Sequence, residues 1–111
     1  MGVYSTLLEE LLENPTPFII ERSVTKLWFY MYGFRQGRDV YERIEDPLYD
    51  GFSTWLARRF RTIPSDMKSS HSWANILLFM AFGSEYEAFN LAKEMWYEYK
   101  AEMQKKNNDE N

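Results

Sequence analysis

The chain has 111 residues, of which 45% are hydrophobic, 18% aromatic and 27% charged, and its formal net charge is −4. This length and composition predict a single folded domain and exclude a largely disordered chain, because so many aromatic rings can bury a core. The absence of cysteine excludes disulfides, thiolate metal sites and a cysteine nucleophile, and one histidine excludes most histidine-based metal sites.

The first helix is predicted over residues 6–13, followed by a proline-rich break. Thr6 and Glu9 have the spacing of a capping box, and the leucines at positions 7, 8, 11 and 12 form an apolar stripe. The sequence NPTP at residues 14–17 predicts the end of this helix, because proline disrupts a helix interior. Residues 18–20 are predicted to form a short extended segment.

The next two helices are predicted over residues 23–36 and 47–60. Ser23 is a good N-cap for the first of them, Gly37 suits its C-cap, and its apolar residues on most sides predict a buried helix. Asp46-Pro47 combines an N-cap with proline at the first helical position, which is a strong start signal. Residues 62–69 are predicted to be a loop.

The last two helices are separated by Gly83. The fourth is predicted to start at Ser70 or Ser72, to end at residue 82 and to occupy the centre of the core, where it would bury Trp73. Ser84 and Glu87 form a capping box for the fifth, which extends to about residue 105. The fold prediction is therefore all-α: about five helices in one compact bundle-like domain over residues 1–105, with a frayed polar tail at 106–111.

Neither a signal peptide nor a membrane helix is predicted. The longest apolar runs, at residues 27–32 and 76–82, are far shorter than the roughly 20 residues of a membrane span. The expected location is the cytoplasm, without a membrane partner.

Residues that could carry catalysis have ordinary structural interpretations as well. His71 among neighbouring serines is either a catalytic base or a polar residue of a first helical turn. Glutamate pairs at positions 9/13, 94/98 and 98/102 could hold a cation, but intervening lysines favour a solvated helix face. The aromatic residues are either a ligand pocket or, as their helical spacing favours, the core. We expect no enzyme activity and no cofactor or metal.

Charge and aromatic patterning favour protein partners over nucleic acid. Arginines cluster between residues 35 and 61, but carboxylates among them neutralise much of their charge, so no direct nucleic-acid binding is expected. Tyrosine is common in protein interfaces, because one end of its ring is apolar and the other tolerates water. Five tyrosines are of interest for this reason: Tyr30, Tyr32, Tyr41, Tyr49 and Tyr97.

The segment FIIERSVTKLWFYMYGF at residues 18–34 resembles a group of small bacterial proteins. Three further motifs are similar to that group in order and spacing: Phe52-x-x-Trp55-Leu56-x-x-x-Phe60, Ser72-Trp73-x-x-Ile76 and Glu85-x-x-Ala88-Phe89. The resemblance covers residues 15–99. It implies a non-enzymatic immunity protein that neutralises a cognate bacterial toxin, such as a nuclease, by occluding it. The alternative is a helical regulatory or scaffold domain, including a homodimer formed through exposed aromatics.

The partner-binding residues are predicted in the segment between the second and third helices. This segment lacks a core pattern, and loops on a rigid scaffold often carry function. The predicted contacts are Asp39, Tyr41, Glu42, Glu45, Asp46, Tyr49 and Asp50. The structural alternative is a solvated loop whose charges pair with arginines and in which Asp46 only caps a helix. A second candidate surface is the acidic first helix at Glu9, Glu10 and Glu13.

Overall fold

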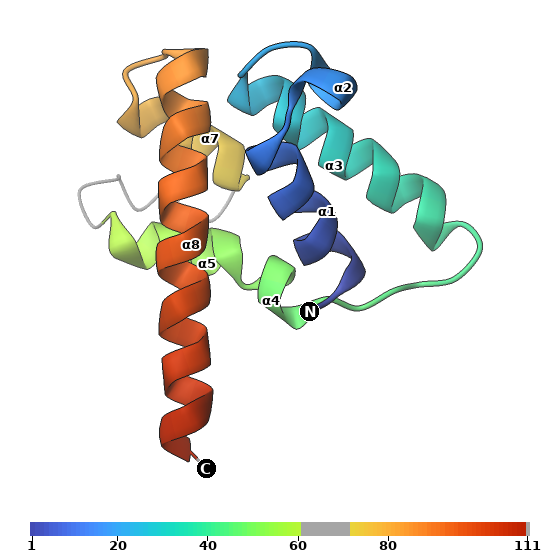
Figure 1. Ribbon diagram of the computed structural model, residues 1–111, viewed down its shortest axis with the longest axis vertical. Helices are drawn as coiled ribbons and strands as arrows, with labels where there is room; N and C mark the ends of the chain where they lie inside the picture. Colours follow the sequence, from blue (N-terminus) through green and yellow to red (C-terminus); the bar gives the residue numbers. More distant parts are fainter. Residues whose placement is uncertain (61–71, 111) are drawn as a thin grey trace.

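The computed structural model describes residues 1–60 and 72–110 (Figure 1). The longer helices are α1 (Val3–Glu13), α3 (Val24–Asp39), α5 (Phe52–Arg59), α7 (Trp73–Met80) and α8 (Glu85–Glu110). Two four-residue helices are α2 (Thr16–Ile19) and α4 (Pro47–Asp50). No strand occurs in these residue ranges, so the all-α prediction is confirmed.

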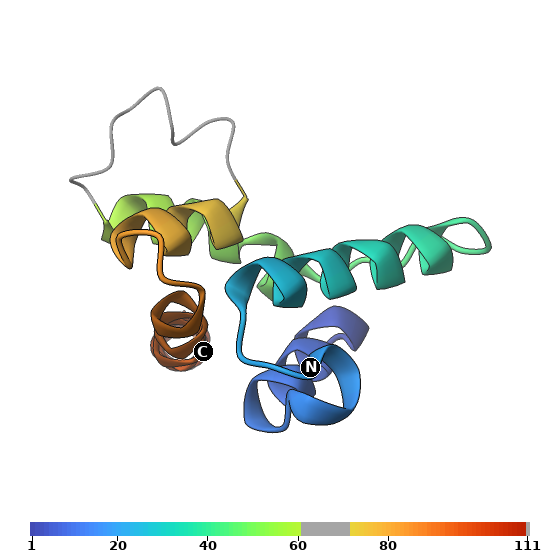
Figure 2. The ribbon, with the colours of Figure 1, turned by 90° about the horizontal axis from the view of Figure 1, so that it is seen from above.

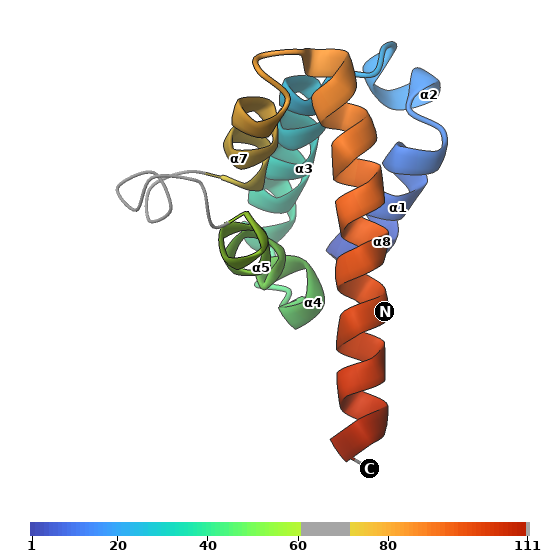
Figure 3. The ribbon, with the colours of Figure 1, turned by 90° about the vertical axis from the view of Figure 1, so that its left-hand side faces the viewer.

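The helices form two layers. Figures 2 and 3 show α3, α4, α5 and α7 on one side of the molecule and α1, α2 and α8 on the other. Helix α8 packs against α1, α3, α5 and α7, and its C-terminal end extends beyond the rest of the molecule (Figures 1 and 3). Although α8 has 26 residues, no helix in the described part of the chain combines the length and apolarity of a membrane span.

An aromatic cluster lies where α5, α7 and α8 meet. The Phe52 ring is fully buried, and its centroid lies 5.1 Å from that of Trp96 and 5.9 Å from that of Trp73. Trp73 is 3% exposed, which confirms its predicted place in the core. Burial of rings of this size contributes strongly to folding, because each removes a large apolar area from water.

Several predicted helix caps are confirmed. The Ser23 hydroxyl accepts a hydrogen bond from the Lys26 N–H, and Ser72 accepts one from the Asn75 N–H. The Ser84 hydroxyl accepts a hydrogen bond of 3.1 Å from the Glu87 N–H. Gly83 ends the α7 turn with a φ of +84°, a left-handed conformation that glycine adopts without a steric penalty.

The predicted start of the first helix and the predicted extended segment are wrong. Helix α1 begins at Val3, so Thr6 lies inside its first turn. Its hydroxyl donates a hydrogen bond to the Gly2 carbonyl instead of capping the helix. Residues 18 and 19 belong to α2, which begins between two prolines. N–H groups in the first turn of a helix have no acceptor within the helix, so proline removes no helix hydrogen bond there. The prolines that end α1 therefore also allow α2 to start.

The predicted end of the second helix and the continuity of the third are also wrong. Helix α3 runs through Gly37 to Asp39, because Asp39 is anchored by side chains of α1 and α3. The predicted helix over 47–60 is two helices that meet at Gly51. There the Tyr99 hydroxyl donates a hydrogen bond to the Leu48 carbonyl, and a Cβ on Gly51 would lie 2.7 Å from that hydroxyl oxygen.

The last helix is longer than its sequence pattern suggested. Helix α8 passes residue 105, where the pattern predicted its end, and continues to Glu110. The predicted loop at 62–69 and a helix start at Ser70 lie outside the described residues.

Candidate functional site

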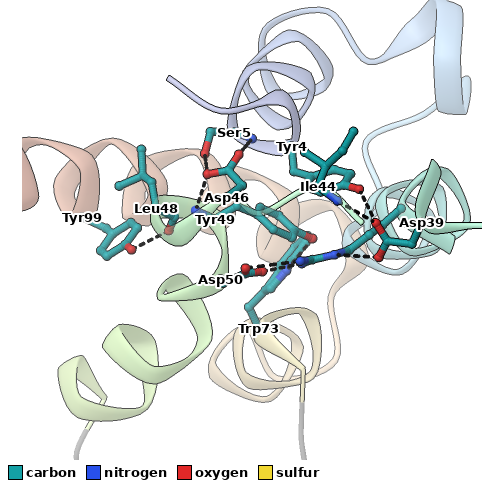
Figure 4. Close-up of polar contacts among 11 residues, drawn as sticks. Tyr4, Ser5, Asp39, Ile44, Asp46, Leu48, Tyr49, Asp50, Trp73 and Tyr99 are labelled. Atoms are coloured by element: carbon teal, nitrogen blue, oxygen red, sulfur yellow. Dashed lines mark hydrogen bonds and ion pairs between the residues drawn. The ribbon is translucent and has the colours of Figure 1, made fainter. Parts of the chain in front are cut away.

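The predicted partner-binding segment leaves α3 at Asp39, crosses residues 40–45 and returns through α4 (Figure 4). Both of its ends are bound to consecutive residues of α1. The Tyr4 hydroxyl donates to Asp39 at 3.1 Å, and the Ser5 hydroxyl donates to Asp46 at 2.9 Å. Residues 40–45 therefore form a loop whose two ends are fixed on one helix.

Asp46 is buried, with 1% of its surface exposed, and serves two helices at once. Its carboxylate accepts the backbone N–H of Tyr49 at 3.2 Å, which caps α4 as the sequence predicted. It also accepts the backbone N–H of Ser5 at 2.7 Å, in the first turn of α1. Asp46 thus supplies the side-chain cap that α1 lacks from its own N-cap residue, Gly2.

Asp39 and Asp50 share one cation, Arg35. The Arg35 guanidinium pairs with both oxygens of Asp50 and lies 3.6 Å from Asp39 through Nε. The hydrogen bond with Asp50 raises the pKa of Arg35 above its ordinary value. The guanidinium carbon also lies 4.7 Å from the centroid of the Tyr4 ring, in a cation–π contact.

Tyr49 is buried, and its hydroxyl accepts a 3.2 Å hydrogen bond from Trp73 Nε1. Burial is the largest cause that raises the pKa of Tyr49, to about 12. Two of the seven predicted partner contacts, Asp46 and Tyr49, therefore lie in the interior and hold the segment in place. Sequence alone did not separate them from the exposed residues, because burial here depends on α1 and α7.

Three predicted contacts point to solvent. Tyr41 is 91% exposed, and Glu42 and Glu45 are exposed beside it. Tyr41 and Glu42 line a shallow pocket of about 290 Å³ with Arg38 and Ile44. Residues 35–50 contain three arginines and five acidic residues, but Asp46 is buried, so the exposed face has a net charge of −1.

An aromatic surface on α3 adjoins the same face. The rings of Trp28 and Tyr32 stack at a centroid distance of 5.0 Å, and Tyr32 is 50% exposed. Both line a pocket of about 270 Å³ together with Arg35 and Asp50. Of these residues, the sequence singled out Tyr32 as an interface candidate, whereas Trp28 was expected in the core and Arg35 in a largely neutralised arginine cluster. Tyr32 and Arg35 follow Trp28 by four and seven residues. This helical spacing is the signal in the sequence that places all three on one side of α3.

The other acidic candidates take part in contacts between helices. Glu9 binds Lys100 at 2.9 Å and Trp96 Nε1 at 3.0 Å, so it is less available to a partner than exposed Glu10. Glu98 pairs with Arg59 across α8 and α5. Within residues 1–60 and 72–110, no group of three or more His, Asp or Glu residues could hold a metal ion. His71 lies outside the described residues.

Comparison of the chain with protein-family models, with curated proteins and with solved structures gives no match.

Proposed function

We propose that this chain is a non-enzymatic, cytoplasmic immunity protein that neutralises a cognate bacterial toxin by binding and occluding it. The resemblance over residues 15–99 supports this function. The observation that carries it is the loop at 40–45. It presents exposed Tyr41, Glu42 and Glu45 while Asp39 and Asp46 hold both of its ends on α1.

Pre-organisation of this loop favours tight binding. Ordering a flexible loop costs free energy on association, and a loop already held at both ends loses little further freedom. Tyr41 offers a rigid amphipathic ring, and tyrosine is enriched at positions that contribute most to interface affinity. The 40–45 loop therefore suits recognition of one defined protein surface.

The charge of this face favours a basic partner. Without buried Asp46, residues 35–50 have a net charge of −1, and the single Arg35 is shared between Asp39 and Asp50. Complementary charge mainly accelerates association and suppresses wrong partners. A toxin that acts on nucleic acid needs a basic cleft, and an acidic loop matches such a cleft in charge.

The aromatic pocket next to this face gives the interface an apolar centre. Trp28 and Tyr32 line it together with the Arg35–Asp50 pair, so apolar and acidic surfaces are continuous. Its volume of about 270 Å³ is below the roughly 300–1,000 Å³ of small-molecule sites and suits one inserted side chain. A basic side chain of the toxin would meet aromatic walls and the Asp50 carboxylate there.

The test uses the toxin encoded by a gene adjacent to that of this chain. Co-expression should restore growth of cells that produce the toxin, and the purified proteins should form a complex. The double variant Glu42→Lys/Glu45→Lys should weaken binding at least about tenfold, mainly through slower association, and reduce its salt dependence. Its melting temperature should stay close to that of the parent, because both side chains are exposed.

The matched control is Glu10→Lys/Glu94→Lys, which makes the same change in charge at exposed positions of α1 and α8. It should bind and protect like the parent. Loss of binding in this control alone would move the interface to the surface formed by α1 and α8. Adjacent genes without a toxin, or a chain that neither binds nor protects, would disprove the proposed function.

A further inference from the structure

Two bulky apolar residues are held outward by an unfavourable backbone conformation. Ile20 has a φ of +70° and Phe82 a φ of +54°, and the described residues contain no other non-glycine residue with positive φ. Ile20 is 80% exposed and Phe82 is 99% exposed. Side chains of L-residues crowd the backbone in this left-handed region, most of all when they are branched at Cβ. The fold therefore maintains a strained conformation at two residues that contribute little to its own core.

Both residues lie at the same end of the molecule. Figures 1 and 3 show the α2–α3 connection and the α7–α8 connection at this end. The two connections are joined by Glu85, which accepts hydrogen bonds from the Ser23 hydroxyl at 3.0 Å and the Thr25 backbone N–H at 2.9 Å. Ile20 and Phe82 are each three residues before this junction in sequence.

Three further exposed rings lie within six residues of this junction in sequence, and with Ile20 and Phe82 they form what we call the apical patch. Phe29 is 61% exposed, Phe79 47% and Tyr86 53%. Ile20 and Phe29 line an open groove of about 460 Å³ between α2 and α3. The apical patch is defined by five residues: Ile20, Phe29, Phe79, Phe82 and Tyr86.

We propose that the apical patch is a homodimer interface in which Phe82 of each copy inserts into the α2–α3 groove of the other. A two-fold dimer pairs one surface with itself, so a projecting ring and a groove on the same patch are used twice. The groove is open and lined mainly by apolar side chains, among them Phe18, Ile20 and Phe29, which an inserted phenylalanine ring would contact.

The exposed area supports a dimer of ordinary size. If each of the five side chains presents roughly 200 Å² when fully exposed, their exposed fractions amount to about 700 Å² per copy. Specific protein interfaces bury about 800 Å² per partner. Contacts at the patch rim would supply the remainder.

Charge on the two halves of the apical patch favours this reciprocal arrangement. Residues 18–29 have a net charge of +1, and residues 79–87 contain two glutamates, of which Glu85 is bonded within the chain and Glu87 is exposed. Insertion of Phe82 into the groove of a second copy brings the acidic half against the basic half, twice in one dimer. The face of residues 35–50 differs, since its net charge of −1 has the same sign on both copies of the chain.

The first test is sedimentation of the purified chain from micromolar to submillimolar concentrations. A monomer–dimer equilibrium is expected. Phe82→Asn should raise the dimer dissociation constant at least about tenfold without lowering the melting temperature, because asparagine tolerates the left-handed region. Ile20→Gly should act in the same direction. Tyr41→Ala, an equally exposed ring on the other face, is the matched control and should leave the dimer unchanged.

The second test locates the contact. Because the chain has no cysteine, Lys26→Cys provides a single attachment site for a spin label beside the groove. Mixing this protein with an unlabelled, ¹⁵N-enriched copy should broaden the Phe82 amide signal of that copy. A chain that stays monomeric at every concentration, or a dimer that Phe82→Asn does not weaken, overturns the proposal. Neither outcome depends on the toxin, so the two proposals succeed or fail separately.

Discussion

Asp46 and Ser5 are 41 positions apart in sequence, yet the Asp46 carboxylate accepts both the backbone N–H and the hydroxyl of Ser5, at 2.7 and 2.9 Å. The same carboxylate caps α4 through the Tyr49 N–H (Figure 4). One buried side chain therefore satisfies the first turns of two helices and fixes one end of the 40–45 loop.

Asp46→Ala should strongly destabilise the fold. Loss of the Asp46 carboxylate removes a helix cap and leaves the Ser5 and Tyr49 N–H groups without an acceptor. Together these effects should lower the free energy of unfolding by about 2–4 kcal/mol. Urea denaturation measures this. Ser5→Ala is the control and should cost only about 1 kcal/mol, since both N–H bonds to Asp46 remain. Equal losses in the two variants would contradict the double-capping role.

Gly2→Ala should also destabilise the protein, because a Cβ at Gly2 would lie 2.3 Å from the Asp46 carboxyl carbon. That carboxylate cannot move away without breaking its hydrogen bonds, so a cost of about 1–3 kcal/mol is expected from overpacking. The double variant Gly2→Ala/Asp46→Ala isolates the clash: its loss should be smaller than the sum of the two single losses. Additive losses would show that the two sites are independent.

Gly37→Ala should stabilise the protein by about 0.5–1 kcal/mol, the usual gain for replacing glycine inside a helix. Gly37 lies within α3, and its added Cβ would meet no atom within 4 Å. Gly33→Ala, one turn earlier in equally open space, should give a similar gain. A loss of stability in Gly37→Ala alone would restore the sequence-based prediction that the helix ends there.

Trp73→Ala should cost about 3–5 kcal/mol, because the ring is 3% exposed and packs against Phe52 in the core. Chemical denaturation followed by circular dichroism measures the loss. Tyr41→Ala removes a 91% exposed ring and should change stability by less than about 0.5 kcal/mol. A small loss in Trp73→Ala would show that α7 is not central to the core.

Tyr49 should make the fold sensitive to alkali. Burial raises its pKa from 10.0 to about 12, so folding favours the neutral phenol. The resulting stability is fully present below pH 10, where tyrosine is neutral in the unfolded chain too, and is lost as pH rises through about 12. Stability of the parent should therefore fall over this range, and Tyr49→Phe should fall less steeply.

Measurement at pH 7 provides the control for Tyr49→Phe. The loss there reports the missing hydrogen bond with Trp73, which is separate from ionisation. If the variant and the parent lose stability equally between pH 10 and 12, ionisation of Tyr49 does not contribute.

Local patterns in the sequence were sufficient for the fold class and most caps. Ser23, Asp46 and Ser72 each accept a backbone N–H three residues later, so the bond that starts a helix lies within four residues of sequence. The buried face of each long helix repeats with helical spacing, and this placed Trp73 in the core. These features depend on near neighbours and are readable without tertiary structure.

Only the tertiary structure decided which residues of the predicted binding segment are exposed. Asp46 and Tyr49 have the same residue types as Asp50 and Tyr41, but α1 and α7 cover the first two and leave Tyr41 in solvent. The boundaries at Gly37 and Gly51 likewise depend on partners supplied by distant helices, Tyr4 at Asp39 and Tyr99 at Leu48. These contacts join groups that are 35 or more residues apart in sequence, and a local sequence pattern does not determine which distant groups come into contact.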